Sequence, residues 1–287
     1  MSPIESTACT RELGNELKLR RKAAGLRGHD IATKLQWSAT KVSRIETGQR
    51  TSDEVDVVFY LAHLGAKRED LDEILPLCRD AERGFWMSRQ LRSLVFHEST
   101  AAETFGYEPL VLPGLLQTED YARALIRQFG LGRDDVNRAV EIRMRRQRIL
   151  RDPWRPVRAA FFVHEQVLHL SIGGNRVMND QLLNLVLLSD QPNIDIRVVP
   201  RCLGEGSYFG PGFHVFYYSG HKPLVYQENG FNGLFMEDAE FVERYQARSQ
   251  EITKAALDAE QSRVLLAALA SEYDRLDKDV PHRVAEE

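Results

Sequence analysis

The sequence predicts a mainly α N-terminal domain of five helices, followed by an α+β domain. Three observations predict this fold class. The chain has 287 residues, more than a single core usually supports. Apolar residues recur at helical spacing through the first eighty residues, and later segments rich in β-branched and aromatic residues alternate with helical ones. We expect domains over residues 1–83 and 84–276 and a polar tail over 277–287, with a hinge at Arg83-Gly84.

The helices of the first domain follow from apolar spacing and cap residues. Leu13 and Leu17 lie on one side of a first helix that reaches Ala24, and Gly25 is placed to end it in a left-handed conformation. Ser52 is a suitable N-cap for the fourth helix. The next four helices are expected over about 28–35, 39–47, 52–64 and 68–82. The apolar face of the fourth is expected to hold Val55, Val57, Val58, Phe59, Leu61 and Ala62.

The third of these helices has an unusual outer face. Ser38 is its expected N-cap, Val42 and Ile45 are its expected buried positions, and Gly48 is placed to end it. The remaining positions, which are small or basic, are Ala39, Thr40, Lys41, Ser43 and Arg44. Two short helices joined by a tight turn, the second with such a face, fit the major groove of DNA.

The N-terminal domain resembles the Cro/CI (XRE) class of helix-turn-helix regulators over residues 11 to about 66. The resemblance is carried by Gly25-Leu26, Ile31-Ala32, Leu35, Ser38, the run Lys41-Val42-Ser43-Arg44-Ile45-Glu46, and Gly48. It implies that the third helix enters the major groove of a double-stranded DNA operator.

The resemblance and the side-chain chemistry together name candidate contact residues. Base contacts are expected from Ala39, Thr40 and Arg44, and Arg44 is the strongest candidate because a guanidinium can donate two parallel hydrogen bonds to guanine. Contacts to phosphates, which set register without reading sequence, are expected from Arg27, Lys41, Ser43, Gln49 and Arg50.

Some positions depart from the family pattern or have a structural role. The family often has Gln at the start of the second and third helices, where this chain has Gly28 and Ala39. The resemblance also implies a buried salt bridge between Arg21 and Glu46, which is structural. We interpret Trp37 as a core residue of the turn.

The second domain is expected to contain both strands and helices. The segment 86–104 is interpreted as helical and broken at Gly106, residues 107–117 as extended, and Thr118 as the cap of a further helix. Strands are expected over 157–163, 194–199, 212–218 and 223–226, and helices over 134–151, 176–189 and 238–276. This pattern allows a sheet with helices over one face.

The second domain also resembles a known family. The segment LVLPGLLQTEDYARAL, an Arg-rich RMRRQRIL helix, GGNRVMNDQLLNL and PNIDIRVVP occur in this order. They are similar to the C-terminal domain of antitoxin-like helix-turn-helix regulators of actinobacteria, over roughly 86–275. This resemblance implies a transcriptional regulator paired with a small protein encoded by a neighbouring gene, and it names no functional residue.

Charge is distributed unevenly along the chain. The net charge is −4, but residues 1–50 carry ten basic and five acidic residues, leaving 28 basic and 37 acidic residues beyond them. The basic end is therefore where nucleic acid is expected to bind. No apolar run is long enough to cross a bilayer and the first ten residues do not resemble a signal peptide, so the expected location is the cytoplasm.

Catalytic and metal chemistry is not indicated. Cys9, Cys78 and Cys202 are far apart in the sequence and are interpreted as reduced thiols. His164-Glu165 with His169 has the wrong spacing for a zinc-protease helix. We expect no cofactor and no enzymatic activity.

The sequence thus predicts a homodimeric, sequence-specific transcription regulator. Its second domain is expected to control DNA binding through a small-molecule effector or a small acidic protein partner. Two alternatives stay open: an antitoxin-like protein-interaction module with little operator reading, which Gly28 and Ala39 favour, and a ligand-modifying enzyme in the second domain.

Overall fold

The computed structural model describes residues 6–80, 85–88, 91–228 and 232–279, and these residues form two compact units. The first unit contains the chain up to Thr100 together with Phe216–Arg244, and the second contains Ala101–Val215 and the chain from Tyr245 onward. The expected hinge at Arg83-Gly84 lies outside the described residues. The domain boundary at that position stays a prediction.

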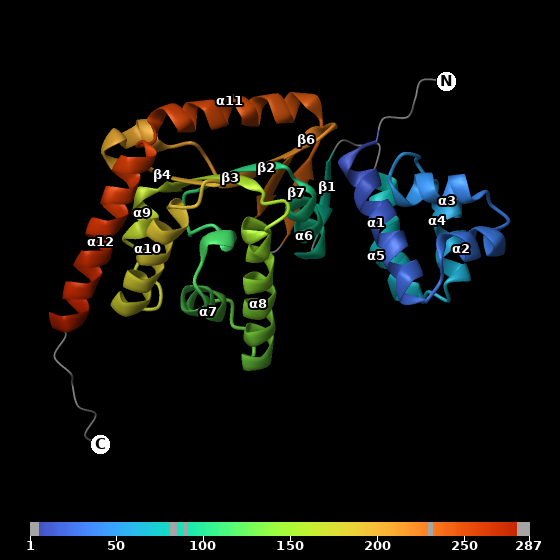
Figure 1. The fold of residues 1–287 in the computed structure, drawn as a ribbon, viewed down its shortest axis with the longest axis horizontal. Helices are drawn as coiled ribbons and strands as arrows, with labels where there is room; N and C mark the ends of the chain where they lie inside the picture. Colours follow the sequence, from blue (N-terminus) through green and yellow to red (C-terminus); the bar gives the residue numbers. More distant parts are fainter. Residues whose placement is uncertain (1–5, 81–84, 89–90, 229–231, 280–287) are drawn as a thin grey trace, which may run out of the picture. The chain divides into compact units, whose positions relative to one another are not determined.

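The N-terminal part of the first unit is helical, as predicted. Over residues 6–80 it contains α1 (Ala8–Ala23), α2 (Gly28–Leu35), α3 (Ala39–Glu46), α4 (Glu54–His63) and α5 (Arg68–Asp80), shown in blue and cyan in Figure 1. Gly25 and Gly48 follow α1 and α3 at φ values of 72° and 68°, a region in which a residue with Cβ is strained. The two glycines therefore end these helices where the sequence indicated.

The fourth helix differs from its prediction in its cap and its buried face. Asp53, not Ser52, is the N-cap, and its side chain accepts a hydrogen bond from the Asp56 amide. The buried residues are Val57, Tyr60 and Leu61. Four members of the expected apolar face lie at the surface: Val55, Val58, Phe59 and Ala62. The helix is apolar on two sides, so hydrophobicity alone did not identify the side that faces the core.

The predicted helix over 86–104 is wrong in part. The chain forms β1 (Phe85–Ser88), then α6 (Leu91–Thr100), then β2 (Glu103–Glu108). In β1 Trp86 is buried while Phe85 and Met87 are exposed, which is the alternation of a strand. Short apolar runs of this kind cannot be assigned to helix or strand by periodicity alone. The expected break at Gly106 is also wrong, because this residue lies inside β2.

The rest of the first unit is an antiparallel arrangement of strands. β7 (Gly233–Met236) pairs with β1 in the register Trp86↔Phe235, and with β6 (His221–Glu228) in the register Tyr226↔Phe235. Strand β5 (Phe213–Tyr218) belongs to the second unit at its start and to the first at its end. The strand order over the described residues is β1-β7-β6-β5-β2-β3-β4.

The second unit is built on parallel strands. β3 (Arg158–His164) pairs in parallel with β2 and with β4 (Ile194–Val199). Its helical segments are η1 (Gly114–Leu116), α7 (Glu119–Arg127), α8 (Arg133–Arg146), η2 (Gln147–Arg151), α9 (Glu165–Leu168), α10 (Asn175–Ser189), η3 (Arg201–Ser207), most of α11 (Ala239–Ala255) and α12 (Ala259–Asp279). Thr118 caps α7 as predicted, since its side chain accepts from the Tyr121 amide.

Helices cover both faces of these strands, not one face as expected. Phe161 shares a core with residues of α10 and α12, such as Leu182 and Leu266. Its neighbour Phe162 points to the opposite face and stacks on Phe105, with ring centroids 4.8 Å apart. On that face a further aromatic contact joins Phe213 to Tyr245 of α11, and Figure 1 shows α11 on the side of the strands away from α10.

Candidate nucleic-acid interface

Helix α3 is short, capped and anchored by two apolar side chains. The Ser38 side chain accepts a hydrogen bond from the Lys41 amide at 3.1 Å. Val42 and Ile45 are each 2% exposed, which stabilises the helix on the domain by about 1.5–3 kcal/mol per side chain. Gln36, at φ 55°, makes the tight turn that precedes the cap. These features fix which side of α3 faces outward.

The outward side of α3 carries the residues that the sequence singled out. The candidate base-contact residues Ala39, Thr40 and Arg44 are all exposed. The Arg44 side chain forms no ion pair and no side-chain hydrogen bond with any described residue. Its five N–H donors are therefore available to a partner outside this chain.

The candidate phosphate contacts fall into two groups. Arg27, Ser43, Gln49 and Arg50 are exposed. Lys41 is not, because its ammonium lies 2.9 Å from an Asp56 carboxylate oxygen and 3.6 Å from the centre of the Trp37 ring. A phosphate would have to compete with Asp56 for Lys41.

A buried ion pair holds α3 to α1. The Arg21 Nε and Nη2 atoms donate to Glu46 Oε1 and Oε2 at 2.6 and 2.7 Å, and both side chains are less than a tenth exposed. The Tyr60 hydroxyl also donates to Glu46, at 2.6 Å. Burial alone raises the pKa of Glu46, but the hydrogen bonds from Arg21 and Tyr60 outweigh it, so the pKa is lowered. The pair that the resemblance implied therefore contacts no surface and has a structural role.

Trp37 lies at the edge of this domain. Its ring is half-buried, with centroids 6.5 Å from Phe59 and 6.4 Å from Tyr60. Lys41 covers one side of it. The structure thus places Trp37 in an aromatic cluster of the domain, where it positions Lys41.

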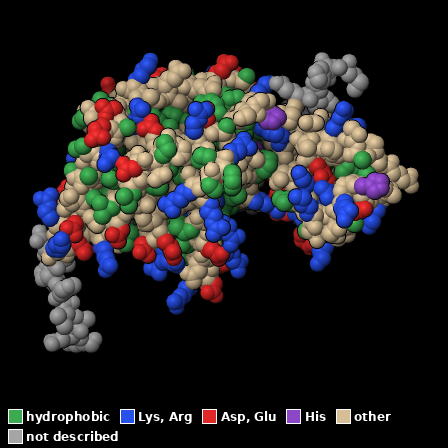
Figure 2. Space-filling model, viewed as in Figure 1, with side chains coloured by type: hydrophobic (Ala, Val, Ile, Leu, Met, Phe, Trp, Pro, Cys, Tyr) green, Lys and Arg blue, Asp and Glu red, His purple; other side chains and the backbone are tan. Residues whose placement is uncertain are grey.

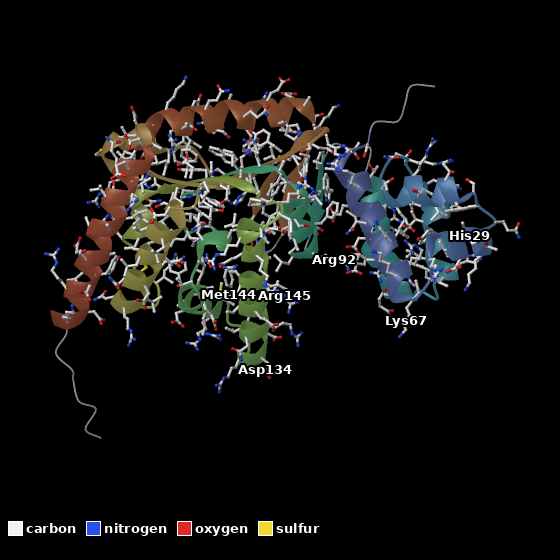
Figure 3. The ribbon with its side chains drawn as sticks, in the orientation of Figure 1. His29, Lys67, Arg92, Asp134, Met144 and Arg145 are labelled. Atoms are coloured by element: carbon white, nitrogen blue, oxygen red, sulfur yellow. The ribbon has the colours of Figure 1, made fainter. Side chains whose placement is uncertain are left out.

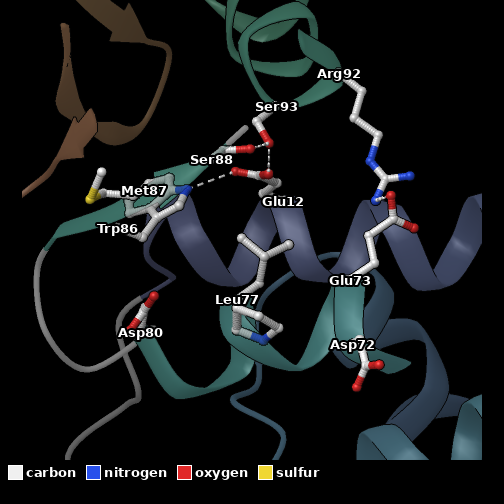
Figure 4. A pocket seen from close by; sticks show the side chains of 11 residues that line it. Glu12, Asp72, Glu73, Leu77, Asp80, Trp86, Met87, Ser88, Arg92 and Ser93 are labelled. Carbon is white, nitrogen blue, oxygen red and sulfur yellow. Dashed lines mark hydrogen bonds and ion pairs between the residues drawn. The ribbon is translucent and has the colours of Figure 1, made fainter. Parts of the chain in front are cut away.

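A second buried carboxylate lies on α1, and no sequence pattern indicated its role. Glu12 is 2% exposed and accepts hydrogen bonds from Trp86 Nε1 at 3.2 Å and from the Ser93 hydroxyl. His97 Nε2 lies 3.1 Å from the same carboxylate, and Tyr218 closes the cluster 2.9 Å from His97 Nδ1. Figure 4 shows Trp86 and Ser93 converging on Glu12 above α1. We call these five residues the Glu12 cluster.

The Glu12 cluster is a packing junction in the first unit, beside a small cavity of about 180 Å³. The residues that contact Glu12 lie on β1 and α6, 74 to 85 residues further along the chain. Tyr218 of β5 joins the cluster through His97. His97 Nε2 is placed to donate to the Glu12 carboxylate, which is an acceptor. The arrangement ties the first helix of the helix-turn-helix domain to strands and a helix that follow it.

Other chemically suggestive residues do not assemble into a site. His169 lies 3.6 Å from Glu165, but among the described residues no group of three potential ligands could hold a metal ion. None of the three cysteines forms a disulfide. In the described part of the chain no helix is long and apolar enough to span a bilayer.

Two protein-family models match the chain. A helix-turn-helix domain model matches residues 12–74, which include α2, α3 and the turn between them. A model described as a domain of unknown function, DUF5753, matches residues 91–268 and covers more than half of the chain. No curated protein matches.

Among solved structures, one match is TrmBL2, an archaeal chromatin protein whose structure is described as showing a novel mode of DNA binding. It is 12% identical, with 81% of this chain and 88% of that chain covered and a TM-score of 0.32. The two family models, by contrast, agree with the fold described above, and by them this chain belongs to the DUF5753 family and carries a helix-turn-helix domain ahead of its family domain.

Proposed function

We propose that this protein is a cytoplasmic, sequence-specific transcription regulator of the XRE type that binds a double-stranded DNA operator as a homodimer. The observation that carries the proposal is the outer face of α3, where Arg44 is exposed and unpaired among the described residues on a helix capped by Ser38. A dimer would present two such helices to successive major grooves about 34 Å apart. We propose no enzymatic activity and no cofactor.

A selection from random duplexes tests the proposal. The full chain is used to enrich DNA, and its affinity for the enriched duplex and for a scrambled one is then measured at several salt concentrations. Arg44→Ala is expected to lose about 1–3 kcal/mol of discrimination at one base position, since it removes a bidentate contact. Lys67→Ala is the matched control, because Lys67 is an exposed cation of the same domain, on the turn before α5 (Figure 3).

The selection has two outcomes that contradict the proposal. One is a wild-type protein that binds enriched and scrambled duplexes alike. The other is an Arg44→Ala protein that keeps the full preference. Sedimentation of the 32.8 kDa chain, alone and on the duplex, tests the dimer.

We further propose that the second unit controls DNA binding by taking up a small molecule or a small acidic protein from a neighbouring gene. Helix α8 supports the acidic partner, since its last turn holds Arg143, Arg145 and Arg146. Figure 2 shows basic side chains gathered over α8, and Figure 3 shows Arg145 on it with Asp134 at its other end. Arg145 of α8 and Arg148 of the following η2 are both exposed. An Arg145→Glu/Arg148→Glu protein is expected to lose the effect of the acidic protein on DNA affinity while it keeps its affinity for free DNA. An unchanged response would contradict this part.

An antitoxin-like protein-interaction module is the alternative function. It is favoured by Gly28 and Ala39, which give the starts of α2 and α3 no amide side chain for DNA. It predicts tight binding of the neighbouring-gene protein by a chain that shows no duplex preference in the selection.

A further inference from the structure

The turn between β5 and β6 lies beside the end of α3, the helix that we propose to enter the major groove. A hollow of about 560 Å³ is lined by Ser6, Gln49, Gly220, His221 and Lys222. All five belong to the first compact unit. Gln49 is the second residue after the C-cap of α3, and Gly220, His221 and Lys222 form the β5–β6 turn and the start of β6. We call this feature the hairpin hollow.

The start of α1 contacts both the end of α3 and the end of β5, and these contacts fix the β5–β6 turn relative to α3. On one side, the Thr10 hydroxyl donates to the Gly48 carbonyl at 3.2 Å, and a Cβ on Gly48 would lie 2.7 Å from Arg11 backbone atoms. The end of α3 is therefore packed directly on the first turn of α1. On the other side, the Arg11 guanidinium lies 4.9 Å from the centre of the Tyr218 ring, at the end of β5.

A further hydrogen bond holds the same end of α1 to the strands. The Ala8 amide donates to Glu237 Oε2 at 2.5 Å, immediately after β7. The recognition helix, the start of α1 and the β5–β6 turn thus form one packed assembly.

The chemistry of the hairpin hollow suits a phosphate group. Its described lining contains an ammonium, an imidazole, a carboxamide and a hydroxyl, and the five lining residues include no carboxylate. These are the groups that contact phosphates in protein–DNA complexes. Two buried polar atoms, the Ser6 hydroxyl and Arg11 Nη2, have no hydrogen-bond partner among the described residues. The other terminal nitrogen of the same guanidinium, Arg11 Nη1, donates to the Ser6 carbonyl at 3.1 Å. Burial, and after it the nearby Arg11 charge, lowers the pKa of His221, so the neutral imidazole, which can still donate a hydrogen bond, is favoured.

We propose that the β5–β6 turn is a second DNA-contacting element, in which Lys222 and His221, with Gln49, bind a backbone phosphate of the duplex that α3 engages. The inference rests on the proposed function. It adds that residues of the DUF5753 match, far from the helix-turn-helix in sequence, contribute affinity without reading bases. A rearrangement of β5 and β6 would then change DNA affinity directly.

Salt dependence tests this contact. Lys222→Ala and His221→Ala/Lys222→Ala are compared with Lys67→Ala, which removes the same charge from another exposed position of the first unit. We expect Lys222→Ala to weaken binding to enriched and scrambled duplexes by the same factor. The slope of log K against log salt should shrink by about 0.9, the value for one phosphate contact, while the Lys67→Ala slope stays that of wild type. Equal melting temperatures confirm that the variants are folded.

Three results would overturn the inference. If Lys222→Ala has the slope and affinity of Lys67→Ala while wild type keeps a preference that Arg44→Ala loses, the turn makes no contact and the proposed function stands. If wild type shows no duplex preference or no binding, the proposed function and this inference both fail. If inorganic phosphate binds wild type but not the Lys222→Ala protein, and DNA affinity is unchanged by the substitution, the hollow is a site for a free anion.

Discussion

Two buried carboxylates of the first unit are held in opposite ways. Glu46 is matched by a full positive charge, since Arg21 binds both of its oxygens. Glu12 is matched mainly by neutral donors, the Trp86 indole and the Ser93 hydroxyl, together with the imidazole of His97. The Arg21–Glu46 pair anchors α3 to α1, whereas the Glu12 cluster joins α1 to later elements of the chain. The first carboxylate is bound by a guanidinium, which keeps its charge, and the second by an indole, a hydroxyl and an imidazole.

The largest expected effect on stability comes from breaking the Arg21–Glu46 pair, which we call the charged anchor. Arg21→Ala leaves Glu46 buried without its cation, and should lower the free energy of unfolding by about 3–5 kcal/mol. DNA binding should fall with the folded fraction. Chemical denaturation followed by circular dichroism measures the loss.

An apolar double variant is the control for the anchor. Arg21→Met/Glu46→Leu removes both charges and should recover most of the stability, because no uncompensated charge stays buried. A double variant as unstable as Arg21→Ala would show that packing, and not the charge, holds α3.

Substitutions in the Glu12 cluster should lower the free energy of unfolding by less than Arg21→Ala does. Glu12→Ala leaves the Trp86 N–H without its acceptor, and a buried donor without a partner costs about 1–3 kcal/mol. The Ser93 hydroxyl keeps a second partner in the Ser88 hydroxyl, 2.8 Å away. We expect a loss of at least that size, measured by denaturation of the full chain. Glu12→Gln, which keeps one acceptor oxygen, should lose less. If both variants were as stable as wild type, the Glu12 cluster would not bear on the stability of the first unit.

The two carboxylates also show what a sequence can predict. The Arg21–Glu46 pair could be expected because both residues, 25 positions apart, lie in the stretch that resembles the Cro/CI class, and the resemblance implied the pair. The partners of Glu12 lie on β1 and α6, elements of which β1 was expected to be helical. Because β1 was not expected to be a strand, no sequence pattern predicted that Trp86 or His97 lies beside α1. The hairpin hollow was missed for a different reason. Both strands that flank its turn were expected, but local spacing does not show that this turn packs beside Gln49, which is 171 residues away in the sequence.

A pH series distinguishes the charged anchor from its neutral form. The folded-state pKa of Glu46 is lowered, so the ion pair contributes stability above the ordinary carboxyl pKa, and this contribution is lost as the pH falls through the folded value. The difference in free energy of unfolding between wild type and Glu46→Gln should therefore be constant near neutral pH. It should shrink as the pH falls below about 4.5, the ordinary value. A difference that does not change between pH 7 and pH 3 contradicts a lowered pKa.

The smallest expected effect concerns Lys41, which forms an ion pair with Asp56 and is also a candidate phosphate contact. Asp56 holds its ammonium in a partly exposed ion pair, an interaction worth about 0.2–1 kcal/mol or less. Asp56→Asn should release Lys41 to a phosphate, so DNA affinity should rise by a few fold and the salt slope should steepen, while stability barely changes. Asp72→Asn, which removes one acidic charge from α5, is the control for net charge. Equal gains in both variants would mean that only overall charge matters. A gain confined to Asp56→Asn, and abolished by adding Lys41→Ala, would show that a neighbouring carboxylate sets how strongly this helix binds the DNA backbone.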